Sequence, residues 1–177
     1  MRINIEGELN KGVVSKDIVL YILSKITASG ATGHAVEFAG SAITALSMEA
    51  RMTICNMSIE MGARCGLIAP DQTTFDYVEG RTFAPKGQEL DQKLLEWKSL
   101  FSDENAVFDK EFFFDAADIE PMITYGTNPG MGIGVNDFVP SKESVDEKDR
   151  ASFVKAMEYM GIKPGAAISG QKIDYVF

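Results

Sequence analysis

The feature that most constrains the fold is the alternation of short strand patterns with helical patterns between residues 1 and 124. Ile3 and Ile5 alternate with polar neighbours at the start of the chain, which is the pattern of a half-buried strand. A stripe of apolar residues at helical spacing then runs from Ile18 to Ile26, shortly after Ser15, a residue type that caps helices. Strands that alternate with helices predict an α/β protein built in layers.

The same alternation continues along the rest of this block. It predicts a strand at 34–40, a helix at 41–63, a buried strand at 66–70, a short helix at 73–81 that Asp71 caps, an amphipathic helix at 87–101, and strands at 111–116 and 121–125. The sequence therefore predicts one α/β domain over residues 1–124.

Residues 125–177 have a different character. A glycine-rich loop at 126–137 is followed by a charged run at 141–150, a helix at 151–161 and an apolar strand at 173–177. We interpret 125–177 as an interdomain loop and the incomplete start of a following α/β domain. Because strand patterns stand at both ends of the chain, we expect it to be a piece of a longer protein.

The composition excludes some functions. Seventeen Lys and Arg stand against 26 Asp and Glu, which gives a net charge of −9. Phosphate binding needs clustered cations, so this charge argues against a nucleic-acid partner. An anionic substrate would likewise need cations from elsewhere. The sequence shows neither the pattern of a signal peptide nor that of a membrane span.

Metal-binding residues are scarce. Cys55 and Cys65 are the two cysteines, and their spacing matches no zinc or disulfide framework. We expect both to pack as small buried hydrophobic residues, and reduced thiols fit a cytoplasmic location. His34 is the one histidine and lies beside a glycine turn, where a structural role is the better interpretation. We therefore predict no metal site within this chain.

Two polar residues stand out within the predicted helix at 41–63. Asn56 and Glu60 lie four residues apart among methionines, isoleucines and alanines, so their side chains should share one helix face. Burying a carboxamide and a carboxylate without partners is costly, so solvent, a ligand or another domain should meet this face. Spacing alone favours a partly exposed pair with no chemistry.

Two other motifs have ordinary interpretations. Glu37 lies in the strand pattern at 34–40 and should point outward, as one residue of an alternating strand does. The glycine-rich segment at 126–134 fits neither the dinucleotide-binding nor the P-loop pattern, because no Lys-Ser/Thr pair follows it. A turn-rich connection is the better interpretation of that segment.

Several ordered blocks nevertheless resemble one known family. They are INIEGELNKGVVSKDIVLYIL, GATGHAVEFAG, MTICNMSIEMGA, APDQTTFDYVEGR, YGTNPGM and KAMEYMGIKPG. Together they resemble a middle section of the large subunits of the aconitase superfamily. APDQTTFDYVEGR and YGTNPGM are closer to the isopropylmalate dehydratase branch than to the aconitase and homoaconitase branches, so a three-layer aconitase-type domain is expected.

The resemblance implies roles for particular residues. Glu60 would contact the hydroxyl or water bound to a [4Fe-4S] cluster, and Asn56 would lie beside cluster and substrate. Thr127 and Asn128 would lie near the substrate cleft. Glu37 would make a structural hydrogen bond at the end of its strand. The cysteines that hold the family's cluster match neither Cys55 nor Cys65, so this chain should bind no cluster itself.

The resemblance also implies partners and an activity. The partners would be the remaining domains of a large subunit, a small subunit and isopropylmalate. The activity would be the hydro-lyase interconversion of 2- and 3-isopropylmalate in leucine biosynthesis, with this section inactive alone. An aconitase-type or homoaconitase-type hydratase remains an alternative, and so does an α/β interaction module without catalysis.

Overall fold

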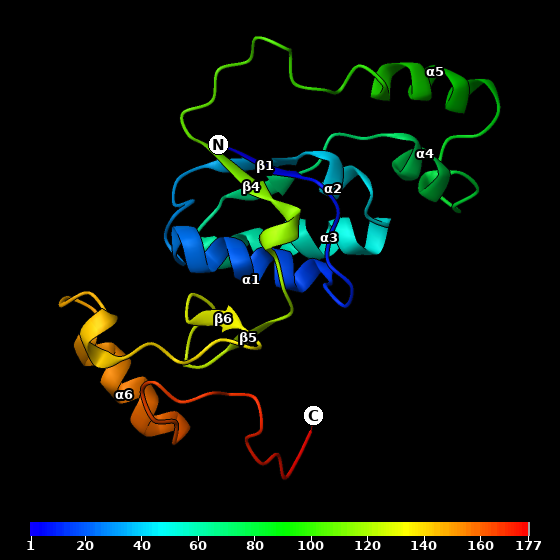
Figure 1. Cartoon of the computed structure of the whole chain (residues 1–177). Helices are drawn as coiled ribbons and strands as arrows, with labels where there is room; N and C mark the ends of the chain where they lie inside the picture. Colours follow the sequence, from blue (N-terminus) through cyan, green and yellow to red (C-terminus); the bar gives the residue numbers. More distant parts are fainter. Residues whose placement is uncertain (177) are drawn as a thin grey trace.

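A four-stranded parallel sheet forms the centre of the computed structural model, which describes residues 1–176 (Figure 1). Its strand order is β3-β2-β1-β4. The strands are β1 (Arg2–Glu6), β2 (Ala35–Ala39), β3 (Cys65–Leu67) and β4 (Glu111–Asp115). Helices connect them, as parallel neighbours require. The predicted α/β class is confirmed.

Strand β1 is buried more completely than its sequence suggests. Ile3, Asn4 and Ile5 are all buried, although alternation predicted a half-buried strand. The reason is its place in the sheet: β1 pairs with β2 on one side and β4 on the other, so both of its edges are covered. A central parallel strand is ordinarily buried on both faces.

Two helices cover one face of the sheet. They are α1 (Ser15–Ile26) and α3 (Met48–Met57), which pack against each other beneath the strands in Figure 1. The main core between sheet and helices contains Ile3, Ile5, Ile18, Val19, Ile22, Leu23, Val36, Phe38, Ile43, Ile54 and Met61. The start of α1 differs from the prediction: Val14, not Ser15, takes the N-cap position, and the Asp17 carboxylate accepts the Val14 N–H at 2.8 Å.

The opposite face of the sheet carries polar contacts. Arg2 and Glu37 are register partners on β1 and β2, with 3.4 Å between the Arg2 Nε and a Glu37 carboxylate oxygen. The Ser102 hydroxyl donates to Glu37, and the ring of Phe108 lies 5.4 Å from the Arg2 guanidinium. Glu37 thus has the structural role that was predicted. Phe113 of β4 stays 71% exposed on this face.

The helix predicted over 41–63 is broken into three pieces. They are α2 (Ser41–Thr44), α3 and the 3₁₀ turn η1 (Ser58–Met61). The break between α2 and α3 has a physical cause: the carbonyls of Thr44 and Leu46 accept hydrogen bonds from the Arg51 side chain, at 2.6 and 3.1 Å. Ser47 then caps α3 by accepting the Ala50 N–H.

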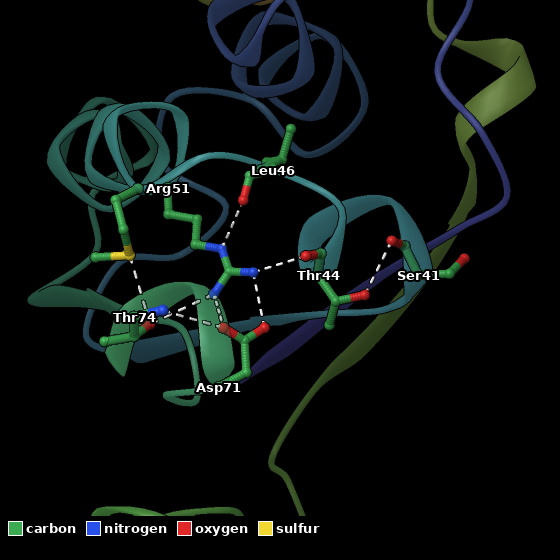
Figure 2. Close-up of polar contacts among 7 residues, drawn as sticks. Ser41, Thr44, Leu46, Arg51, Asp71 and Thr74 are labelled. Atoms are coloured by element: carbon green, nitrogen blue, oxygen red, sulfur yellow. Dashed lines mark hydrogen bonds and ion pairs between the residues drawn. The ribbon is translucent and has the colours of Figure 1, made fainter. Parts of the chain in front are cut away.

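Arg51 is the hub of a buried polar network (Figure 2). Its guanidinium is 3% exposed and donates two hydrogen bonds, at 2.6 and 2.7 Å, to the two carboxylate oxygens of Asp71. Asp71 also caps α4 (Gln72–Val78) by accepting the Thr74 N–H at 3.3 Å, so the predicted cap is confirmed. One ion pair therefore joins the α2–α3 turn, α3 and α4.

Strand β3 lies at the edge of the sheet, and this corrects two expectations. The segment was predicted to be buried, yet Leu67 is 54% exposed. Cys65 is exposed as well and Cys55 only partly buried, so the prediction that both cysteines are core residues is wrong. An edge strand has only one neighbour to cover it.

A second substructure lies on the other side of α1. Strands β5 (Met122–Thr124) and β6 (Gly132–Gly134) form an antiparallel hairpin that packs on α1, so α1 lies between sheet and hairpin (Figure 1). The boundary expected at Thr124 falls inside this hairpin. Helix α6 (Arg150–Met160) follows, with a small core of Tyr125, Val139, Phe153, Ala156 and Met157.

The remaining elements are short or peripheral. Helix α5 (Gln88–Trp97) lies above the sheet beside α4, where Trp97 stacks on Phe75 at 6.5 Å between ring centroids (Figure 1). Two 3₁₀ turns, η2 (Ala116–Asp118) and η3 (Lys142–Ser144), complete the set. The strand predicted at 173–177 is wrong for residues 173–176, which are exposed and pair with nothing in the described chain, and residue 177 lies outside the described residues.

Replacing Arg51 by methionine should lower the free energy of unfolding by about 3 kcal/mol, because two carbonyls and a carboxylate lose their shared donor. Urea denaturation followed by circular dichroism measures this. Arg64→Met is a matched control, since Arg64 is exposed, and should change stability by less than about 0.5 kcal/mol. An equal loss in both variants would contradict the assigned role of the network.

The same ion pair predicts a pH dependence. The hydrogen bonds from Arg51 hold the pKa of Asp71 below its usual value. A carboxyl whose pKa is lower in the folded state stabilises the protein above its unfolded pKa of about 3.9 and loses that contribution as the pH falls below it. The stability difference between wild type and Asp71→Asn should therefore shrink between pH 6 and pH 3. A difference that stays constant across this range would exclude the linkage.

Candidate functional site

A cavity of about 900 Å³ opens where the start of α1, the end of α3 with η1, the loop after β5 and the end of α6 meet. Lys16, Asp17 and Leu20 of α1 form one wall. Met57 and Glu60 form the second wall, and the third is built from Met122 to Thr124 together with Gly126 to Pro129. Tyr159 and Met160, at the end of α6, add a fourth side. Residues far apart in the sequence are thus brought to one concave surface, which is the usual form of a small-molecule site.

Three of the four residues predicted for the site meet in this cavity. Glu60, Thr127 and Asn128 all line it, although 66 residues separate Glu60 from the nearest of the other two along the chain. Asn56 does not line it. The helix tightens from α to 3₁₀ geometry at Ser58, which turns Glu60 further around the axis than α-helical spacing predicts.

Glu60 is exposed in the cavity. Among residues 1–176 no hydrogen bond or ion pair engages its carboxylate. Asn56 is exposed too, so the polar pair expected on this face meets solvent and is not buried against protein in the described chain. A carboxylate that is free of internal partners is available to accept a hydrogen bond from a ligand hydroxyl or from water.

The loop that carries Thr127 and Asn128 connects β5 to β6. The Asn128 side-chain oxygen accepts the Gly130 N–H at 2.9 Å, and its backbone carbonyl accepts the Met131 N–H at 3.0 Å. Tyr125 closes the loop by donating its N–H to the Met131 carbonyl at 3.0 Å. Asn128 therefore shapes the loop, while Thr127 stays exposed beside it.

Asp17 joins two walls of the cavity. Its carboxylate is 8% exposed and accepts the N–H of Val14 and the N–H of Met122, each at 2.8 Å. One side chain therefore fixes the first turn of α1 to the start of β5. Sequence reasoning placed Asp17 in the first helical turn but missed this second partner, because the contact bridges 105 residues.

Lys16 is a second residue that sequence reasoning missed. We expected the cations for an anionic ligand to come from elsewhere, yet Lys16 lines the same cavity as Glu60. A lysine that opens a helix is ordinarily a solvated surface residue. Only the packing of the hairpin on α1 places Lys16 at a concave surface.

The chain's own residues do not fit an iron–sulfur cluster. Such clusters are held by cysteine thiolates, and neither Cys55 nor Cys65 lines the cavity. Burial raises the pKa of the Cys55 thiol, and the neighbouring Cys65 raises it further, which opposes formation of the thiolate. Over the described part of the chain, no group of three or more His, Cys, Asp or Glu residues is arranged to hold a metal. His34 instead lies 3.0 Å from the Thr32 carbonyl, as a structural residue would.

No helix within residues 1–176 combines the length and the apolar character that crossing a membrane requires.

Comparisons with known sequences identify the family of the chain. The model of the aconitase family (aconitate hydratase) matches residues 1–177, and the chain belongs to this family. Over its whole length it is similar to proteins named 3-isopropylmalate dehydratase large subunit: 60% identical to that of Bacteroides fragilis, 58% to that of Cytophaga hutchinsonii and 54% to that of Flavobacterium johnsoniae. The chain spans 38% of the length of each of these relatives.

The isolated chain should bind no iron–sulfur cluster, because it offers two cysteines outside the cavity and no further thiolate. Anaerobic reconstitution with iron and sulfide, followed by iron and sulfide analysis, measures this. A Cys55→Ala/Cys65→Ala variant is the control, and its residual iron should equal that of the wild type. Stoichiometric cluster that disappears in this variant would show that the two cysteines are ligands.

Proposed function

We propose that this chain supplies part of the active site of a 3-isopropylmalate dehydratase, which interconverts 2- and 3-isopropylmalate by removing and adding water in leucine biosynthesis. The observation that carries the proposal is the cavity, which gathers Glu60 of η1 with Thr127 and Asn128 of the β5–β6 loop. The names of the 54–60% identical relatives support the choice of reaction.

Glu60 is the acid–base residue of this proposal. Its carboxylate is exposed in the cavity and free of partners within the described chain, so it can accept a hydrogen bond from the substrate hydroxyl or from water. Holding that oxygen in one orientation helps a hydroxyl to leave as water and helps water to return. The Thr127 hydroxyl offers a donor and an acceptor from the opposite wall. Asn56 does not line the cavity, so the proposal places it beside the cofactor and outside the cavity.

The cofactor of the proposed enzyme is a [4Fe-4S] cluster. When bound, the cluster supplies a Lewis acid to the leaving hydroxyl. This chain's cysteines do not fit its ligand set, so the proposal assigns no cluster ligand to the chain. In this proposal the role of the chain is limited to binding and orienting the substrate and to holding a proton at Glu60.

The partners follow from the same proposal. They are the other domains of a large subunit, a small subunit and the substrate, in the cytoplasm. The chain alone should not turn over isopropylmalate, because its two cysteines and the other residues in the described part of the chain offer no ligand set for a Lewis-acid cluster. Residues 1–124 would form one domain, and 125–177 would lead into the next.

Glu60→Gln tests the central role in a complete large subunit assembled with its small subunit. The amide keeps the shape but loses the charge that orients the hydroxyl, so kcat should fall by about 10²-fold or more. Stability should stay within about 0.5 kcal/mol, because Glu60 is exposed. The rate is followed by the absorbance of the unsaturated intermediate.

Glu49→Gln is the matched control for this prediction. Glu49 is an exposed carboxylate in the first turn of α3 and does not line the cavity, so its variant should keep the wild-type rate. A near wild-type kcat in Glu60→Gln would show that Glu60 is an ordinary surface carboxylate.

A further inference from the structure

We infer that Lys16 binds a carboxylate of the hydroxy-acid substrate, while the apolar base of the same cavity receives its branched alkyl group. This inference rests on the proposed function and adds to it the orientation of the substrate. It starts from how polar and apolar side chains are distributed over the three walls.

Three walls of the cavity, on α1, on α3 with η1 and on β5 with its following loop, run from an exposed polar residue to a more buried apolar one. On α1, Lys16 is exposed and Leu20, one turn further on the same face, is only 6% exposed. On the second wall Glu60 is exposed, whereas Met57 packs partly buried against the main core. The third wall has the same order, with an exposed polar residue and a more buried apolar one.

On that third wall Thr127 is exposed in the β5–β6 loop, and Met122 packs partly buried against the main core. These three walls therefore present polar groups at the mouth and apolar groups below it, while Val14 and the α6 residues Tyr159 and Met160 add exposed apolar surface to the cavity. The ligand that fits such a cavity has charged and hydroxyl groups at one end and an alkyl group at the other. A branched hydroxy acid has this form.

Among the residues that the structure describes, Lys16 is the one cationic side chain on the cavity walls. Within residues 1–176 no ion pair engages it. Asp17 lies next to it, but the carboxylate of Asp17 already accepts two backbone N–H groups. The Lys16 ammonium is thus free to donate charge-assisted hydrogen bonds to a ligand carboxylate.

Glu60 has the opposite preference. An anionic side chain repels a ligand carboxylate but accepts from a hydroxyl, so the hydroxyl should lie toward Glu60 and the carboxylate toward Lys16. Lys16 can serve only one of the two carboxylates of isopropylmalate. The other carboxylate needs a cation from outside these walls.

The test uses the complete large subunit assembled with its small subunit and measures KM and kcat for 3-isopropylmalate. Lys16→Met should raise KM by about 10- to 100-fold, the usual effect of losing a hydrogen bond to a charged group. The value of kcat should change by less than about threefold, because the contact is made in the ground state and the transition state alike. Lys16→Arg should restore much of the affinity, since it keeps the charge.

Two controls separate this effect from others. Lys11→Met removes the same charge from an exposed lysine that does not line the cavity, and its KM should equal that of the wild type. Malate keeps both carboxylates but lacks the isopropyl group. As a competitive inhibitor it should bind the wild type more weakly than 3-isopropylmalate, and Lys16→Met should weaken both ligands by the same factor.

The outcomes are distinguishable. An unchanged KM in Lys16→Met, or an equal rise in Lys11→Met, overturns the assignment of Lys16 while the proposed function stands. Malate that binds as tightly as 3-isopropylmalate overturns the alkyl assignment. An unsubstituted enzyme that does not turn over isopropylmalate overturns the proposed function and this inference together.

Discussion

The ion pair between the buried Arg51 and the partly exposed Asp71 is the constraint on which the arrangement of the helices depends. The Arg51 guanidinium donates hydrogen bonds to the carbonyls of Thr44 and Leu46. These carbonyls then do not accept helical hydrogen bonds, so the chain turns between α2 and α3. The ion pair also holds the cap of α4 (Figure 2). A buried guanidinium with matched acceptors tolerates few other arrangements, because each lost partner leaves a desolvated polar group. The turn between α2 and α3 sets the direction of α3 and therefore the position of Glu60, which follows it.

Asp17 positions the walls of the cavity, as Arg51 positions the helices. The Asp17 carboxylate accepts the backbone N–H of Val14, which precedes α1, and the backbone N–H of Met122 in β5. The hairpin is thereby fixed against α1, and the β5–β6 loop with Thr127 is held opposite Glu60. In both places an ionised side chain compensates its burial with backbone partners. Arg51 and Asp17 thus position the other residues that line the site.

Much of the fold could be predicted from the sequence, because hydrophobic periodicity is a local property. The strand at 34–40, the cap at Asp71 and the helix at 151–161 were predicted close to their observed places. The predictions were wrong where contacts between residues far apart in the sequence determine the structure. Arg51 broke the helix predicted over 41–63, and the edge position of β3 exposed Cys65. Residues 173–176 are apolar enough for a strand but have no strand partner in the described chain.

The sequence by itself determined the family and the residues to watch, because Asn56, Glu60, Thr127 and Asn128 stand in recognisable blocks. The sequence could not show which of these residues line the same cavity. The tertiary structure brought Glu60 to Thr127 and Asn128, left Asn56 outside, and added Lys16 to the same cavity. The reason is physical: a lysine at a helix start and a glycine-rich loop become one concave surface only when the hairpin packs on α1. That packing depends on a contact between Asp17 and Met122, which no local pattern encodes.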